Sequence, residues 1–184
     1  MHQIPSSNFF KIEKLLKGLN KVYIDATEGE IQRPSDYELK QDYYSEKKMH
    51  SVKNAIIGTK KNKIMYLSKT YEGAVHDKKI IDTEQWKFPQ GIKACEDLGF
   101  EGHYQNGVDI IRPVKKPKGK EWTEQQKAED TAKSLDRVKV EHIFGQTKVY
   151  RIVKDTIRLW KKIYANINDF IMEICCGLHN FKTQ

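Results

Sequence analysis

Three acidic residues stand where the surrounding sequence predicts buried or closely packed structure. Asp25 follows Val22-Tyr23-Ile24, a run of β-branched and aromatic residues that is typical of a buried strand. Asp97 ends a second predicted strand, which starts at Ile92, and Glu141 lies on the predicted apolar face of a helix. Because an unpaired buried charge costs several kcal/mol, each carboxylate needs a cation, a hydrogen-bond donor or water beside it.

The chemistry of these acids depends on whether they meet in the fold. Taken alone, Asp25 equally fits a residue that ends a strand and caps the next turn, helped by Gly29. Three clustered carboxylates would repel one another and take up protons unless a cation neutralised them. Hard oxygen ligands favour Mg²⁺ or Mn²⁺ over zinc, so a cluster of Asp25, Asp97 and Glu141 predicts a site for such an ion.

Histidine and cysteine make a weaker case for a metal. Cys175 and His179 have the i, i+4 spacing of two ligands on one helix, but no second pair at ligand spacing accompanies them. Cys175 and Cys176 are therefore expected in the core, and Cys95 has no base specified beside it that would make it a nucleophile. Three cysteines, two of them adjacent, form no disulfide framework, which indicates a reducing compartment.

The chain is strongly basic. Its 184 residues include 33 Lys and Arg against 25 Asp and Glu, a formal net charge of +8 at pH 7. Such a surface favours polyanions, of which nucleic acid is the commonest in cells, although ribosomal or membrane-surface binding would give the same balance. An acidic metal site in basic surroundings fits an enzyme that acts on a phosphodiester backbone.

The sequence shows no targeting or membrane segment. The first ten residues contain no basic stretch followed by an apolar one, and nowhere do about 18 apolar residues run together. We therefore expect a cytoplasmic protein with no membrane partner, associated with the nucleoid if its host is a bacterium. The length, with 38% hydrophobic residues, fits one domain with its own core.

The apolar pattern predicts an α/β domain that begins with a sheet. Residues 1–20 form a helical lead-in, and residues 22–28 form the first strand. Residues 29–44 are polar and turn-rich, and Pro34 argues against a regular element there. Two further strands complete an antiparallel meander, residues 49–57 and 64–68.

The period of the pattern then changes. Residues 78–86 predict a helix and residues 92–97 a strand, which leaves through a glycine turn at Leu98-Gly99-Phe100. Residues 108–111 predict one more short strand. Because a strand, a helix and another strand are the signature of a parallel crossover, we expect a mixed sheet of three antiparallel strands plus parallel ones.

The last third of the chain is predicted to be helical, after a basic linker. In residues 114–120, Lys115, Lys116 and Lys118 belong either to a solvated loop or to a phosphate contact. Residues 157–181 have a broad apolar face that should pack on the sheet. Before them, a long helix starts near Trp122, and its apolar face consists of Leu135, Val138, Ile143, Phe144, Val149 and Ile152.

Five segments together resemble a known family. In order, and within residues 20–182, they are similar to the DDE endonuclease domain of insertion-sequence transposases, in the group related to Harbinger elements. The stretch Glu173-Ile174-Cys175-Cys176-Gly177-Leu178-His179-Asn180 is similar to the family's closing helix. The five segments are Val22-Tyr23-Ile24-Asp25-Ala26-Thr27-Glu28, Gly73-Ala74-Val75-His76-Asp77-Lys78-Lys79, Asp97-Leu98-Gly99-Phe100-Glu101-Gly102, Pro113-Val114-Lys115-Lys116-Pro117-Lys118-Gly119-Lys120 and Val140-Glu141-His142-Ile143-Phe144-Gly145.

The resemblance implies a ribonuclease-H-like catalytic domain over residues 21–184. Asp25 and Asp97 on adjacent strands and Glu141 on the following helix would be its catalytic, metal-binding triad. Asp77 would be an accessory carboxylate near the metals, although its motif has Ala74 where a small polar residue is common. Two Mg²⁺ or Mn²⁺ ions about 3.5–4 Å apart would support DNA cleavage and strand transfer.

The resemblance also implies DNA as the partner, at the transposon ends and the target. Such transposases carry a helix-turn-helix region before the first catalytic strand, for which residues 1–20 leave little room. We therefore expect the catalytic part of a split, frameshifted or decayed element, which self-associates and works with a separately encoded helix-turn-helix part. The alternative is a catalytically inactive DNA-binding or multimerisation remnant. Four basic residues flank the helical acid and hold the DNA backbone or form a solvated face: Lys139, His142, Lys148 and Arg151.

Overall fold

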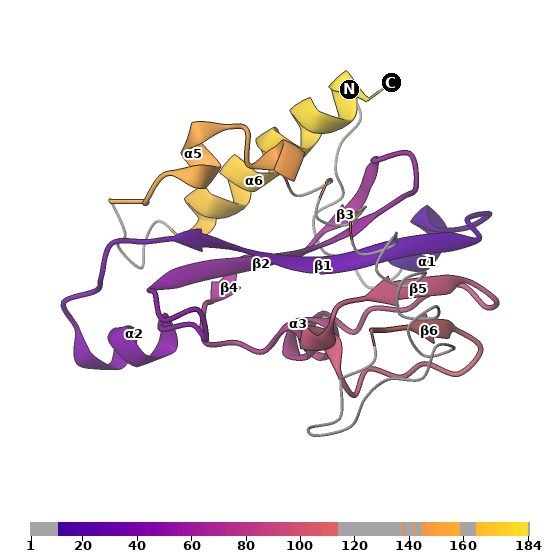
Figure 1. Cartoon of the computed structure of the whole chain (residues 1–184), viewed down its shortest axis with the longest axis horizontal. Coiled ribbons are helices and arrows are strands. Elements are labelled where there is room, and N and C mark those ends of the chain that lie inside the picture. The colour runs from indigo at the N-terminus through magenta and orange to yellow at the C-terminus, as the bar shows by residue number, and fades with distance from the viewer. Residues whose placement is uncertain (1–10, 114–137, 139–141, 143–144, 159–164, 184) are drawn as a thin grey trace, which may run out of the picture.

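A single mixed sheet organises the chain, and its strands run in the order β3-β2-β1-β5-β6, with β4 paired to β2 (Figure 1). The computed structural model describes residues 11–113, 138, 142, 145–158 and 165–183. The strands are β1 (Lys21–Glu30), β2 (Ser51–Gly58), β3 (Ile64–Leu67), β4 (Tyr71–Glu72), β5 (Lys93–Glu96) and β6 (Asp109–Ile111).

The first three strands form the predicted antiparallel meander. β1 pairs with β2 along eight residue pairs, from Tyr23 opposite Gly58 to Glu30 opposite Ser51. β2 then pairs with β3, and every residue of β2 is buried because helices or loops cover both faces of the sheet there. The short strand β4, which the sequence pattern did not predict, adds two pairs beyond the end of β3.

The other half of the sheet is parallel, as the crossover pattern predicted. β5 lies beside β1 in the same direction, with Ile24 opposite Glu96, and β6 continues the parallel pairing. The helix α3 (Asp77–Glu84) lies between the two halves in sequence. A mixed sheet with helices on both faces confirms the predicted α/β, ribonuclease-H-like class.

Two apolar clusters fasten helices to the two faces of the sheet. On one face, α1 (Lys11–Leu15) and α3 pack against alternate residues of β1 and β2 such as Ile24 and Ile57. On the other face, α5 (Arg151–Lys154) and α6 (Ala165–Lys182) pack against the intervening residues, among them Tyr23 and Ile56. Figure 1 shows α5 and α6 on the side of the sheet opposite to α3.

The helix α3 is held at its C-terminal end by Glu84. Its carboxylate accepts hydrogen bonds from Tyr66 Oη at 2.8 Å, from Trp86 Nε1 at 2.7 Å and from the backbone N–H of Lys69 at 2.8 Å. Burial raises the pKa of Tyr66, and the negative charge of Glu84 adds to the rise. The predicted helix ended at Trp86, but Gln85 takes a left-handed conformation, with φ of 49°, and ends it earlier.

The helix α6 is joined to the sheet by polar as well as apolar contacts. Buried Asn168 donates to Asn54 Oδ1 at 3.3 Å and to Thr70 Oγ1 at 3.1 Å. Near the other end, Asn180 Oδ1 accepts from the N–H of Ile64 and its Nδ2 donates to the carbonyl of Ile64, both at 2.8 Å. Cys175 and Cys176 lie in the core as predicted, and burial raises the pKa of Cys176 to about 12.

The prediction that residues 29–44 lack a regular element was wrong. The strand β1 continues to Glu30, and α2 (Tyr37–Asp42) forms where only turns were expected. Asp36 caps α2, since its carboxylate accepts hydrogen bonds from the backbone N–H groups of Glu38 and Leu39. Pro34 precedes this cap and therefore does not interrupt the helix. The predicted glycine turn at residues 98–100 is the short 3₁₀-helix η1 (Leu98–Phe100).

The predicted long helix is confirmed at residues 138, 142 and 145–147, which are helical, but its continuation through Ile152 is wrong. The chain turns at residues 148–150, α5 starts anew at Arg151, and Val153 is the residue that it buries. Val138, Val149 and Ile152 of the predicted apolar face are exposed. The other residues of that helix lie outside the described part of the chain.

The second predicted helix starts later than expected. Ile157 forms a parallel bridge with Ile31, and α6 begins at Ala165. As predicted, one face of α6 packs on the sheet. Its outer face is exposed and carries Ile167, Phe170, Ile174, Leu178 and Phe181. Among the helices that the structure describes, none has the length and apolar character needed to cross a membrane.

Replacing Asn168 with Leu should destabilise the protein by about 1–3 kcal/mol, because Asn54 and Thr70 then lose a buried partner. Leucine is the better helix former, so helix propensity alone predicts that the substitution stabilises the protein. Urea unfolding of Asn168→Leu measures the change, with Phe170→Leu on the exposed face as the control. Equal stability of Asn168→Leu and the native protein would show that this network contributes nothing.

Candidate active site

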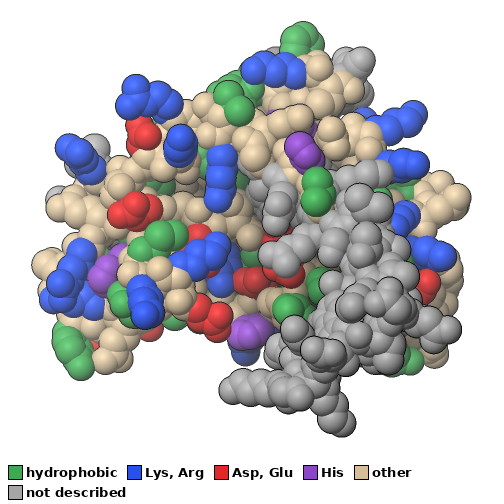
Figure 2. Space-filling view, viewed as in Figure 1, with side chains coloured by type: hydrophobic (Ala, Val, Ile, Leu, Met, Phe, Trp, Pro, Cys, Tyr) green, Lys and Arg blue, Asp and Glu red, His purple; other side chains and the backbone are tan. Residues whose placement is uncertain are grey.

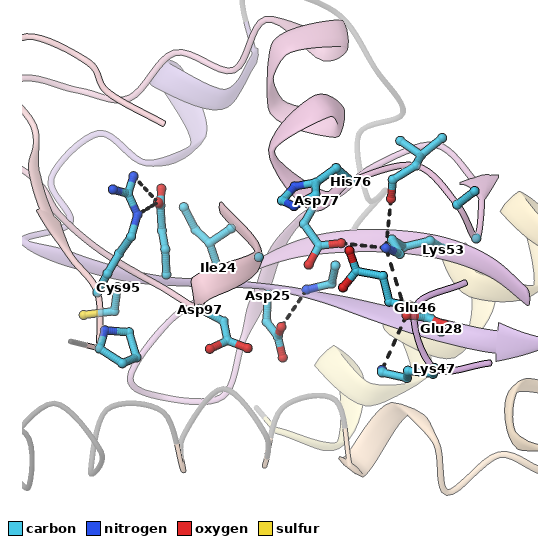
Figure 3. A pocket seen from close by; sticks show the side chains of 18 of the residues that line it. Ile24, Asp25, Glu28, Glu46, Lys47, Lys53, His76, Asp77, Cys95 and Asp97 are labelled. Carbon is cyan, nitrogen blue, oxygen red and sulfur yellow. Dashed lines mark hydrogen bonds and ion pairs between the residues drawn. The ribbon is translucent and has the colours of Figure 1, made fainter. Parts of the chain in front are cut away.

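A cavity of about 400 Å³ opens where β5 and its parallel pairing with β1 end. Figure 2 shows acidic and basic side chains side by side near the middle of this view, and Figure 3 shows the cavity from close by. Acidic and basic side chains from distant segments line it, namely Asp25, Glu28, Glu46, Lys47, Lys53, Asp77, Glu96, Asp97 and Arg112.

Asp25 and Asp97 are brought together by the pairing of β1 with β5. Because Ile24 lies opposite Glu96 in parallel register, the next residue of each strand reaches the same edge of the sheet. Both aspartates line the cavity, and their carboxylates point to the same side of β1 in Figure 3. Asp25 Oδ1 accepts a hydrogen bond from the backbone N–H of Ala26 at 2.8 Å, which fixes the orientation of its carboxylate.

The environment of Asp25 disfavours its negative charge. Burial raises the pKa of Asp25 to about 7, and the charges of Asp97 and Asp77 add to the rise. The N–H of Ala26 and the ammonium of Lys47 act in the other direction without cancelling it. A carboxylate in this position binds a proton or a cation near neutral pH, which is the electrostatic condition of a metal ligand.

Asp77 reaches the cavity from the start of α3 and is paired with a lysine. Its Oδ1 lies 2.8 Å from Lys53 Nζ, and Lys53 also donates to the carbonyl of Val75 at 2.8 Å. Glu28 completes the group, since its Oε1 lies 4.0 Å from Lys53 Nζ and its Oε2 accepts from Ser51 Oγ at 2.9 Å. Asp77 therefore has a protein cation as its partner.

Glu96, next to Asp97, is the centre of a second buried ion-pair group. Its side chain has no exposed surface, and its Oε1 lies 2.5 Å from His103 Nδ1. Arg112 binds the other oxygen through Nε at 3.0 Å and through its terminal nitrogen at 2.9 Å, and it also donates to the carbonyl of His103. These contacts tie β5 to the loop that leads into β6.

The basic residues predicted to contact DNA are described only in part. Lys148 is half-buried, and burial together with the charge of Lys47 lowers its pKa, whereas Asp25 and Glu28 act to raise it. Lys148 is therefore near the cavity. His142 is exposed, and exposed Arg151 pairs with Asp155 at 3.2 Å. Glu141 and four of the predicted DNA contacts lie outside the described residues, namely Lys115, Lys116, Lys118 and Lys139.

The donor set of the cavity fits a hard divalent cation. Its acidic groups offer oxygen ligands, and among the described residues no cation lies as close to buried Asp25 as Lys53 lies to Asp77. Within the described residues, no three acidic, histidine or cysteine side chains converge with metal-ligand geometry. The described part of the site is therefore a pair of carboxylates, to which a third ligand has to be added.

Several residues of the cavity were not identified from the sequence. Lys53 stands in the middle of an apolar strand, and a lysine in a fully buried strand is a signal that the sequence offered. Glu96 is likewise an acid inside a predicted buried strand. Lys47 and Arg112 carry no comparable signal, because they reach the cavity only through the tertiary fold.

Replacing Asp25 with Asn should change how stability depends on pH. The native state keeps the Asp25 proton up to about pH 7, whereas the unfolded chain loses it near its ordinary pKa of 3.8. The free energy of unfolding therefore falls as the pH rises from about 4 to above 7. Between pH 5 and pH 8 we expect a fall on the order of 1–3 kcal/mol that Asp25→Asn lacks.

Urea unfolding in the presence of EDTA measures this difference. Asp109→Asn, at an exposed aspartate of β6, is the matched control and should keep the fall. The same pH dependence in Asp25→Asn and in the native protein would contradict a raised pKa at Asp25.

Comparison with known proteins identifies the family of this chain. Residues 24–180 match the family model described as DDE superfamily endonuclease. The chain is also 29% identical, over 164 residues, to the probable transposase for insertion sequence element IS702 of Microchaete diplosiphon. That alignment covers 89% of this chain and 57% of the relative, so the chain spans a little over half of that protein's length. No solved structure gives a significant match. The matched residues include both halves of the sheet and the residues that line the cavity. The chain therefore belongs to the DDE endonuclease superfamily.

Proposed function

We propose that this chain is the catalytic domain of an insertion-sequence transposase, which cleaves DNA and transfers the cut strand to a target. The observation that carries the proposal is the pair of carboxylates, Asp25 and Asp97, which line one cavity where the parallel pairing of β1 with β5 ends. Burial, which raises the pKa of Asp25, makes an isolated negative charge there unfavourable and so favours a bound proton or cation.

Asp25, Asp97 and Glu141 would hold the metal ions, with Asp77 as the predicted accessory carboxylate. Bound Mg²⁺ or Mn²⁺ would activate a water or a 3′-hydroxyl and stabilise the leaving oxygen of an in-line displacement. The role of the protein is to position the ions and to balance their charge. The backbone N–H of Ala26 orients the Asp25 carboxylate, and Asp25 would give up its proton if a cation were bound there.

The basic surface would hold the DNA backbone near this cavity. The net charge of +8 supports DNA as the partner, and Lys148 lies close enough to Asp25 for the two charges to interact. The other residues proposed to contact phosphates are Lys115, Lys116, Lys118, Lys139, His142 and Arg151.

Recognition of transposon ends requires contacts to bases, which an acidic catalytic centre does not provide. We therefore include in the proposal a separately encoded helix-turn-helix part that reads the ends, and self-association that brings two ends together. A cytoplasmic, nucleoid-associated location would follow from this role. The IS702 relative is itself named a probable transposase, which supports the same assignment.

Nicking of supercoiled plasmid tests the proposal. The native chain should nick DNA with Mg²⁺ or Mn²⁺ and not with EDTA, and Asp97→Asn should lower the rate at least about a hundredfold, a loss usual when a preorganised charge-stabilising group is removed. Asp109→Asn, an exposed aspartate on the neighbouring parallel strand, should retain the native rate.

The same assay separates the alternative function. A catalytically inactive DNA-binding or multimerisation remnant would bind DNA and show no nicking in any variant. Equal nicking by the native chain and Asp97→Asn would indicate a contaminating nuclease and would likewise contradict the proposal.

Replacing Lys148 with Met should weaken DNA binding in a salt-dependent manner. If its ammonium contacts one phosphate, the slope of log K against log salt should become less steep by about 0.9. Fluorescence anisotropy with a random-sequence duplex at several salt concentrations measures the slope. Lys60→Met, on the exposed turn after β2, is the control, and equal slopes for the two variants would place Lys148 away from the backbone.

A further inference from the structure

A buried lysine lies on the face of the sheet opposite to Asp25. Lys53, in the interior strand β2, is 8% exposed, and its ammonium is bound by the carbonyl of Val75 and by Asp77, both at 2.8 Å. Replacing a buried ion pair with apolar residues of similar volume is often neutral or stabilising. The pair is therefore poorly explained by stability alone, which directs attention to what Asp77 touches.

The carboxylate of Asp77 packs against the turn that carries Asp97. A Cβ atom built on Gly99 would lie 2.1 Å from Asp77 Oδ2 and 3.0 Å from Asp77 Cγ, and the three nearest atoms to it all belong to Asp77. The φ angle of Gly99 lies outside the left-handed region, so an L-residue could adopt this backbone. A residue with a Cβ atom at this position would have to displace the Asp77 carboxylate.

Asp77 and the aspartate pair approach the turn from opposite sides of the sheet. Lys53 lies opposite Glu28 and Ile56 lies opposite Asp25 in the β1–β2 ladder, so the alternation of side chains places Lys53 and Asp25 on different faces. In Figure 3, Asp25 and Asp97 point to one side of β1, whereas Asp77 comes from α3 and points to Lys53. Asp77 thus contacts the turn at Gly99 from the side of the sheet opposite to Asp25 and Asp97.

We infer that the Lys53–Asp77 ion pair is a positioning device, which presses on Gly99 and thereby holds the turn Leu98–Phe100 and the carboxylate of Asp97 in place beside Asp25. This inference rests on the proposed function for its purpose, since Asp97 needs a fixed place only if it binds a metal. It gives Asp77 the role of a positioning residue, in contrast to the accessory metal ligand that the sequence predicted.

Hydrogen exchange in the metal-free protein tests the contact without any activity. The backbone N–H groups of Phe100 and Glu101 donate to Asp97 and Leu98 within the turn, so their exchange reports its opening. Lys53→Met, Asp77→Asn and Gly99→Ala should each speed this exchange at least about tenfold and leave the core strands protected. Gly177→Ala, at an open position of α6, is the control and should leave the turn unchanged.

Coupling between Gly99 and Asp77 is the decisive measurement. In an Asp77→Ala background the added methyl group meets no carboxylate, so Gly99→Ala should add no further acceleration. An equal effect of Gly99→Ala with and without Asp77, or an unchanged turn in Lys53→Met, would overturn the inference.

Mn²⁺ binding measured by calorimetry separates positioning from ligation. Lys53→Met and Asp77→Asn should weaken Mn²⁺ binding by a similar factor, about tenfold, and their combination should weaken it no further, whereas Asp97→Asn should abolish it. If Asp77→Ala abolishes Mn²⁺ binding while the turn exchanges at its native rate, Asp77 is a ligand and the inference is wrong. If the native chain binds no Mn²⁺, the proposed function fails, and the exchange data still decide whether the contact holds the turn.

Discussion

The burial of Asp25 beside Asp97, where the parallel pairing of β1 with β5 ends, is the constraint on which the site depends. Because Ile24 pairs with Glu96 in parallel register, Asp25 and Asp97 lie at the same edge of the sheet. Burial of Asp25 then removes the water that would screen the two charges. The fold therefore places an unfavourable electrostatic interaction at this edge, which a proton or a cation bound there would relieve.

Two carboxylates stay close together only if the surrounding structure holds them rigidly. The interior strand β2 is buried throughout, and α3 is fastened at one end by Glu84 and at the other by the pair of Asp77 with Lys53. On the far side of Asp97, buried Glu96 is bound by His103 and Arg112. The two aspartates thus stand on a frame whose polar groups are paired, which is what preorganisation of a charged site requires.

The sequence predicted those parts of this arrangement that follow from local pattern. Alternating apolar residues and the change of period were enough for the meander, the crossover and the shared edge of Asp25 and Asp97. Lys53 was overlooked because a lysine in a strand is ordinarily assigned to a solvent-facing side, and β2 has none. Arg112 reaches Glu96 only through the path of a loop. Val149 and Ile152 fit a helical face, but the turn at residues 148–150 points them outward and buries Val153 instead.

The bidentate contact of Asn180 with Ile64 has a consequence for the behaviour of shortened forms of the chain. β3 is an edge strand, and an open edge offers its N–H and carbonyl groups to any passing strand. By binding both groups of Ile64, the amide side chain occupies the place that a foreign strand would take. A chain cut before α6 would expose these groups of Ile64 together with the apolar face of the sheet that α6 covers, so aggregation through β3 is the failure to expect from such a fragment.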